Sequence, residues 1–293
     1  MSFKERCQES GRKVISASRR TDLPARFPEW LSRALAEESA AVRSPSGHTF
    51  VADLRPGAVH TIVLWSKDFS ALLEDRHAMR ALLRKYDQVY LLFTITGLGG
   101  TFIENGVLSP EKAMAQIGPL AETAGHPRRV SLRFDPVVWW NEAGRERTNL
   151  SFFETLAPRA AAEGITDIRF SLAQWYGKAR RRAAKRGFDF VDPPVETKLE
   201  AARFLAGVAA AWKLNLYGCS QDFLTKVPGI MASACIDGRL LSELHPGREP
   251  VSLRKDRSQR PECGCTESVD IGSYTQSCPH ACLYCYANPK TGG

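Results

Sequence analysis

The alternation of short apolar runs with amphipathic stretches over the first 220 residues constrains the fold of this chain more than any other feature. Six runs predict β-strands because they are apolar or alternating in pattern. These runs are 14–18, 61–66, 89–96, 130–136, 166–171 and 213–220. Strands that alternate with helices predict parallel βα units.

The intervals between these runs have helical periodicity. Ser109 is the expected N-cap of one helix, with Pro110 at its first helical position. The sequence SFFE at 151–154 has the pattern of a capping box. The predicted helices are 27–39, 68–86, 109–122 and 196–212.

Because crossovers between parallel strands are right-handed, such a chain forms either a barrel or a doubly wound sheet. We favour an α/β fold in which residues 1–220 form a partial (β/α)6 TIM-like barrel. Residues 221–293 are expected to form a helical and loop extension that ends in a cysteine-rich tail on the barrel mouth. This tail has little periodicity, and a bound metal can supply the free energy that orders such a segment.

Composition and charge constrain the surroundings of the chain only broadly. Apolar residues make up 43% and charged residues 25%, and no apolar run is long enough to cross a membrane. The polar start of the sequence predicts a cytoplasmic protein. The net charge of +8 permits an anionic partner, and the basic run at 178–186 is either a solvated helix face or an anion-binding surface.

Seven of the eight cysteines fall between residues 219 and 285. Cytosolic thiols are kept reduced, so this skew indicates metal or redox chemistry instead of disulfides. Cys278, Cys282 and Cys285 are spaced to converge in one loop. With His280 they suit a structural zinc ion, and alone they suit a four-iron cluster that keeps one iron open.

The remaining cysteines of this region are expected to hold a second, fully protein-ligated cluster or a zinc ion, or to share no metal. A solitary thiol in the N-terminal leader, Cys7, is expected to have no role. The candidate ligands of the second site are Cys219, Cys235, Cys263 and Cys265.

Polar residues follow several predicted strands, at the end where parallel α/β folds gather their chemistry. The arginines have the fork geometry that binds carboxylate or phosphate. The same residues also suit a buried salt-bridge network that closes the barrel. The candidate catalytic residues are Arg19, Arg20, Asp22, Lys67, Arg133 and Asp135.

The run from Cys278 to Cys285, with Tyr284 before the last thiol, resembles the CxxxCx(aromatic)C signature of radical S-adenosylmethionine (SAM) enzymes. The wider pattern resembles the family of domain of unknown function eighteen forty-eight. The segments that carry this resemblance are 15–30, 62–68, 133–137 and 263–288.

This resemblance implies that the three cysteines hold a 4Fe–4S cluster whose open iron binds SAM. It implies a place beside the adenine for Tyr284, and the loop with Gly99 and Gly100 is either a SAM contact or a plain turn. The implied reaction is reductive cleavage of SAM to a 5′-deoxyadenosyl radical, which abstracts hydrogen from a substrate that the resemblance does not identify. The basic charge of the chain permits an anionic or nucleotide-like substrate. A flavodoxin or ferredoxin is the expected reductant.

One departure from the radical SAM pattern is that the motif ends the chain, whereas it usually follows the first strand. A tail that folds back over the barrel mouth would bring it to the equivalent place. The alternative function is a metal-stabilised nucleic-acid-binding protein without catalysis, and a metal-dependent hydrolase ranks last because the strand ends have few carboxylates.

Overall fold

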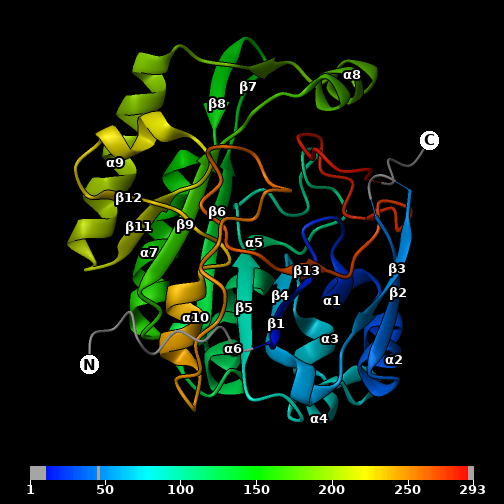
Figure 1. Cartoon of the computed structure of the whole chain (residues 1–293). Coiled ribbons are helices and arrows are strands. Elements are labelled where there is room, and N and C mark those ends of the chain that lie inside the picture. Colours follow the sequence, from blue (N-terminus) through cyan, green and yellow to red (C-terminus); the bar gives the residue numbers. More distant parts are fainter. Residues whose placement is uncertain (1–10, 45–46, 290–293) are drawn as a thin grey trace.

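The computed structural model describes residues 11–44 and 47–289, and a parallel eight-stranded sheet dominates it (Figure 1). Cys7 lies outside the described residues. The strand order across the sheet is β12-β11-β9-β6-β5-β4-β1-β13, and all neighbouring strands are parallel. The strands are β1 (Lys13–Ala17), β4 (Val59–Ser66), β5 (Val89–Thr94), β6 (Val130–Val137), β9 (Asp167–Leu172), β11 (Asn215–Gly218), β12 (Ile230–Ala232) and β13 (Val269–Asp270).

All six predicted strands are confirmed, and the expected α/β class with them. From β1 to β12 the spatial order follows the sequence order, so each strand lies beside the next one along the chain. The sheet is open in the described part of the chain, with β12 at one edge and β13 at the other. Residues beyond 220 therefore supply both edge strands of the sheet.

The helices lie between successive strands, as the alternation predicts. Two small antiparallel sheets complete the fold: β2 (Ser39–Arg43) with β3 (Thr49–Asp53), and β7 (Trp139–Glu142) with β8 (Arg145–Thr148) and β10 (Phe190–Val191). The helices are α1 (Leu23–Arg26), α2 (Pro28–Ala36), α3 (Ser70–Leu73), α4 (Met79–Leu83), α5 (Pro110–Ala115), α6 (Ile117–Thr123), α7 (Phe153–Ala162), α8 (Gly177–Lys185), α9 (Val195–Ala211) and α10 (Gly238–Leu244). None of the helices that the structure describes combines the length and apolar character needed to cross a membrane.

The two faces of the large sheet are covered by different parts of the chain. Strand residues alternate between faces, so Leu64 packs with the helices α1 to α7 and α9 while its neighbours Val63 and Trp65 point to the opposite face. On that opposite face, α10 and the segment 233–265 pack on the strands (Figure 1). The C-terminal extension thus fills the face that the crossover helices leave open.

Two local predictions about helices are wrong. The stretch 68–86 is not one helix, because Asp75, His77 and Ala78 have positive φ angles and break it between α3 and α4. Helix α7 has no side-chain cap from the SFFE pattern and starts after a 3-10 turn. The cap of α5 is confirmed: the side chain of Ser109 accepts a hydrogen bond from the backbone N–H of Lys112.

Strand β13 joins the end of the chain to its beginning. It pairs with β1, where Val269 lies opposite Ile15, and the backbone N–H of Ile271 donates to the carbonyl of Ser16 at 2.9 Å. The Asp270 carboxylate accepts hydrogen bonds from the hydroxyls of Ser16 and Ser18 at 2.9 and 2.8 Å. These contacts direct the following residues to the C-terminal end of β1.

Candidate functional site

The tail loop, defined here as residues 278–285, lies against the C-terminal ends of the first strands of the sheet. The backbone N–H of Gly106 donates to the carbonyl of His280 at 3.1 Å, and the N–H of Leu283 donates to the carbonyl of Ile103 at 3.0 Å. His280 of the loop also contacts Asp22, which follows β1, and Tyr284 contacts Glu104, which follows β5. The tail therefore folds back to the first strand, as the sequence analysis required.

Asp22 is the buried carboxylate that ties these segments together. It accepts hydrogen bonds from His280 Nε2 at 2.7 Å, from the Ser66 hydroxyl at 2.7 Å, and from the backbone N–H of Lys67 at 2.8 Å. It also caps α1 through the N–H of Ala25. Burial alone would raise the pKa of Asp22, but the contacts with His280, Lys67 and Ser66 outweigh it and lower the pKa. Asp22 is thus placed as a positioning residue.

A second buried carboxylate, Glu104, holds the aromatic residue of the motif. The Tyr284 hydroxyl donates to Glu104 Oε1, and Lys67 Nζ approaches the same oxygen at 3.0 Å. The ammonium group of Lys67 also lies 5.8 Å from the centre of the Tyr284 ring. Glu104 is 1% exposed, and its other oxygen, Oε2, has no hydrogen-bond partner among the described residues. A bound ligand with a donor group would satisfy that oxygen.

The three thiols of the tail loop are free and largely shielded from solvent. Burial raises the pKa of Cys278 to about 11, and it raises the pKa of Cys282 and of Cys285 above the ordinary value. Positive charge nearby would reverse this shift and favour the thiolate that binds metals. Lys67 attracts the Cys282 thiolate, and Arg182 of α8 donates to the carbonyls of Leu283 and Cys285.

The arginines predicted as ligand clamps bind the chain itself. Arg20 Nη1 donates to the carbonyl of Gly272 at 2.9 Å. Arg19 donates from its backbone to Asp270 at 2.8 Å and from its side chain to Ser268 at 3.0 Å. Both arginines therefore fasten the segment around β13 to the end of β1.

Arg133 and Asp135 form an ion pair at the C-terminal end of β6. The Ser171 hydroxyl, at the end of β9, donates to the same carboxylate. The guanidinium of Arg133 lies over the ring of Trp65, 5.1 Å from its centre. Its Nε has no partner in the described part of the chain. Arg133 therefore keeps one guanidinium nitrogen for a ligand, whereas Arg20 donates to the Gly272 carbonyl.

The glycine run after β5 lies next to Glu104. Gly99 forms an isolated bridge with Glu104, and the backbone N–H of Gly100 donates to the Glu104 carbonyl at 3.1 Å. A side chain at Gly99 would collide with the Leu108 carbonyl, and Gly100 has a φ of +77°. The glycines thus allow the sharp turn that presents Glu104 to Tyr284.

The four-thiol site consists of the other cysteines of the C-terminal region. Cys235 lies near Cys219 and Cys265, and Cys265 lies near Cys263. The contact with Cys235 lowers the pKa of Cys219 to about 7. Within residues 11–44 and 47–289, no three or more His, Cys, Asp or Glu side chains are arranged, as they stand, to hold a metal ion.

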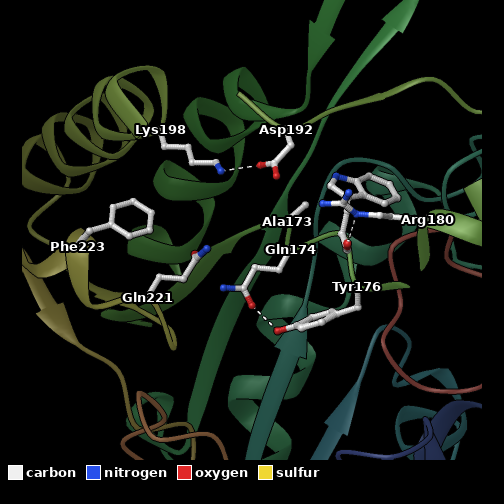
Figure 2. A pocket seen from close by; sticks show the side chains of 9 residues that line it. Ala173, Gln174, Tyr176, Arg180, Asp192, Lys198, Gln221 and Phe223 are labelled. Carbon is white, nitrogen blue, oxygen red and sulfur yellow. Dashed lines mark hydrogen bonds and ion pairs between the residues drawn. The ribbon is translucent and has the colours of Figure 1, made fainter. Parts of the chain in front are cut away.

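A cleft of about 310 Å³ opens at the C-terminal ends of β9 and β11 (Figure 2). Its wall combines aromatic rings, amides and charges, with an ion pair of 2.6 Å between Lys198 and Asp192. The Gln221 amide is fixed by two bonds to the backbone of Leu172. Figure 2 shows Tyr176 and Phe223 on opposite sides of the opening.

Helix α8 carries the basic run and contacts both this cleft, through Arg180, and the tail loop, through Arg182. Arg180 Nε donates to the carbonyl of Trp175 at 2.6 Å, and Arg182 holds the tail loop. Arg181 and Lys185 are exposed. The run is therefore partly structural and partly a solvated face.

Several residues of this region were not predicted from the sequence. Glu104, Arg169 and Trp65 gave no motif or spacing signal. His280 was considered as a zinc ligand, but the structure pairs it with Asp22.

The fold and these sites define an α/β protein with a parallel sheet and two cysteine-rich sites at its C-terminal end. The profile of the family described as "Domain of unknown function (DUF1848)" matches residues 14–287, so the chain belongs to this family. None of the curated proteins matches the chain significantly.

Proposed function

We propose that this protein is a radical SAM-type iron–sulfur enzyme. In this proposal Cys278, Cys282 and Cys285 hold a 4Fe–4S cluster and leave one iron open for SAM. The observation that carries the proposal is the position of the tail loop: its thiols lie beside the C-terminal ends of β1, β4 and β5, although they come last in the sequence. The successive order of β1 to β12 supports the expected partial barrel, in which such strand ends surround the reaction.

The residues present fit such a cluster. Three free thiols come from one short loop, and burial makes their anionic forms costly unless positive charge is close. Soft thiolates are the ligands that iron–sulfur clusters use. The unpaired oxygen of Glu104 lies on the residue that holds Tyr284, and it supplies an acceptor for a bound cofactor.

When bound, the cluster supplies the electron that splits SAM into methionine and a 5′-deoxyadenosyl radical. The residues of the chain itself position the tail loop and shield Cys282 from water. Glu104 fixes the Tyr284 ring beside the loop, and Lys67 places a positive charge near Cys282. The Asp22–His280 bond holds the loop backbone in place. Cys282 and Leu283 are 5% and 1% exposed, so the loop excludes water from the central thiol, Cys282.

The substrate proposed for this site is an anionic or nucleotide-like molecule. The Arg133–Asp135 pair offers an unpaired guanidinium nitrogen, and the cleft of Figure 2 offers aromatic rings and amides. Aromatic faces stack on bases, and arginine forks bind phosphate or carboxylate. A flavodoxin or ferredoxin is the proposed reductant.

Anaerobic reconstitution with iron and sulfide tests the proposal. The reduced protein is expected to cleave SAM, and Cys282→Ala is expected to cleave it only at the background rate. Ser277→Ala, an exposed position beside the motif, is the control and is expected to retain wild-type activity. SAM cleavage by Cys282→Ala at the wild-type rate would contradict the proposal.

The alternative is a metal-stabilised nucleic-acid-binding protein without catalysis, and the exposed basic side chains of α8 favour it. Its test is salt-dependent binding to nucleic acid after neutralising Arg181 and Lys185. Arg182 is unsuitable for this test because it holds the tail loop. Loss of binding in this variant, together with no SAM cleavage by the wild type, would support the alternative.

A further inference from the structure

The four-thiol site is assembled from three separate segments of the chain. Cys219 follows β11, Cys235 follows β12, and the other two thiols come from the loop before β13. Three of the four are buried, with exposures of 3% for Cys235, 8% for Cys263 and 2% for Cys265. None of the four forms a disulfide. Three segments far apart in sequence each bring thiol side chains to this point. Four thiols are a donor set that suits a soft metal.

A buried arginine beside the thiols supplies a second, independent observation. Arg169 is 2% exposed and donates to the Ala234 carbonyl, the Tyr90 hydroxyl and the Ser131 hydroxyl. No ion pair joins it to a carboxylate in the described part of the chain, although it lies close enough to Cys235 to interact with its charge. A buried cation without an anion is costly, so a negative group is expected here.

Two more arginines lie near the same thiols. Arg19 lies near Cys265 and is also paired with Asp256 at 3.7 Å, and Arg133 lies near Cys219 and Cys235 and is also paired with Asp135. The three guanidinium groups come from the turn after β1 and from β6 and β9, so they line the site on the sheet side. A cluster held by four thiolates carries net negative charge, which Arg169, the arginine without a carboxylate partner, would balance.

A tetrahedral zinc and a four-iron cluster can each take four cysteine thiolates. A tetrahedral zinc needs all four sulfurs at about 2.3 Å from one centre. Among the described residues, no group of His, Cys, Asp or Glu side chains is arranged, as it stands, to hold a single ion. In a cubane each cysteine binds a different iron, so its four thiolates stand farther apart than those around one zinc.

We propose that the four-thiol site holds a second iron–sulfur cluster of the four-iron class, with a protein thiolate on every iron. This inference does not rest on the proposed function of the tail loop, because it concerns other ligands. It assigns the buried Arg169 as the countercharge of the cluster.

The test is iron and sulfide analysis, with electron paramagnetic resonance, of the anaerobically reconstituted full chain. The wild type is expected to contain about eight irons, because each cluster of this class holds four. A variant with Cys278→Ala, Cys282→Ala and Cys285→Ala is expected to keep about four irons, and its reduced signal is expected not to change when SAM is added. A value near zero in this variant would overturn the inference, as would one zinc per chain or a disulfide between these thiols.

A reciprocal variant guards against failure of the triple variant to fold. Cys235→Ser with Cys265→Ser is expected to lose about four irons and to keep the signal that responds to SAM. An unchanged iron content in this variant would also overturn the inference. If the wild type shows no response to SAM while the triple variant keeps four irons, the proposed function fails and the second cluster stands.

Discussion

The tail loop and the four-thiol site lie at the same end of the sheet, but the chain assembles them in different ways. The tail loop carries its three thiols within eight consecutive residues and is attached to the sheet by hydrogen bonds such as Asp22–His280. The four-thiol site needs β11, β12 and the loop before β13 to be in place together. Sequence spacing predicts that the thiols of a local loop converge, whereas the four dispersed cysteines could be grouped only by their number, and the fold is needed to show that they meet.

The tail loop and the four-thiol site also differ in the charged side chains around them. The tail loop is contacted by three basic side chains, Lys67, Arg26 and Arg182, and by the carboxylates of Asp22 and Glu104, and Glu104 keeps an oxygen free. The four-thiol site lies near Arg19 and Arg133, each paired with a carboxylate, and near Arg169, which has no carboxylate partner among the described residues. The free carboxylate oxygen suits an exchangeable cofactor with a donor group, and the unpaired guanidinium suits a permanent anionic group.

The largest expected effect comes from a glycine that touches the tail loop. A methyl group at Gly106 would lie 2.3 Å from the Pro279 carbonyl oxygen and 2.9 Å from the His280 Cα. Gly106→Ala is therefore expected to displace the loop, to remove about four irons and to abolish SAM cleavage. Gly207→Ala, where the added methyl meets nothing within 4 Å, is the matched control. Wild-type SAM cleavage by Gly106→Ala would show that the loop is not held at this point.

A matching change tests the other region. A methyl group at Gly264, between two of the four thiols, would lie 2.6 Å from the Ser233 carbonyl oxygen. Gly264→Ala is expected to lower the iron content by about four while the SAM-dependent signal of the tail loop remains. Iron analysis and electron paramagnetic resonance measure both quantities, and loss of both signals together would show that the two regions are not independent.

A smaller effect is expected at Asp22. Asp22→Asn keeps the shape but weakens the bonds from His280 and Lys67, which is expected to cost about 1–3 kcal/mol of the free energy of unfolding. Because the folded state lowers the pKa of Asp22, its contribution is complete above the ordinary aspartate pKa of about 4 and is lost as the pH falls through the lower folded value. Thermal unfolding of the metal-free proteins between about pH 3 and 7 is the measurement. A difference between wild type and variant that grows on acidification would contradict the assignment.

The smallest effect is expected at Tyr284. Tyr284→Phe removes the hydroxyl that donates to Glu104 and leaves the Lys67 contact with the same carboxylate intact. One hydrogen bond is worth about 0.5–1.5 kcal/mol, so the KM for SAM is expected to rise by roughly 2- to 10-fold at unchanged iron content. A loss of iron in this variant would instead mean that Tyr284 holds the loop together.

The sequence predicted most strands of the large sheet because these strands are long enough to show an apolar or alternating pattern. All six of the main strands were found from apolar runs, whereas β12 and β13 have three and two residues and are too short for periodicity. The break at Asp75 was missed because apolar spacing alone does not register positive φ angles.

For the sites, sequence spacing identified the cysteines but not their surroundings. Glu104 and Arg169 matter because of partners far along the chain, such as Tyr284 for Glu104 and the Ala234 carbonyl for Arg169. Such contacts depend on the register of several strands at once, and no local pattern encodes them.

Strand β13 has a consequence for the order in which the molecule is made. It is the last strand of the sheet in the sequence, yet it pairs with the first. During synthesis from the N-terminus, every other strand of the large sheet leaves the ribosome before it. The large sheet is therefore complete only after residues 269–270 have emerged, so inorganic cofactors would meet a nearly complete chain instead of a nascent one.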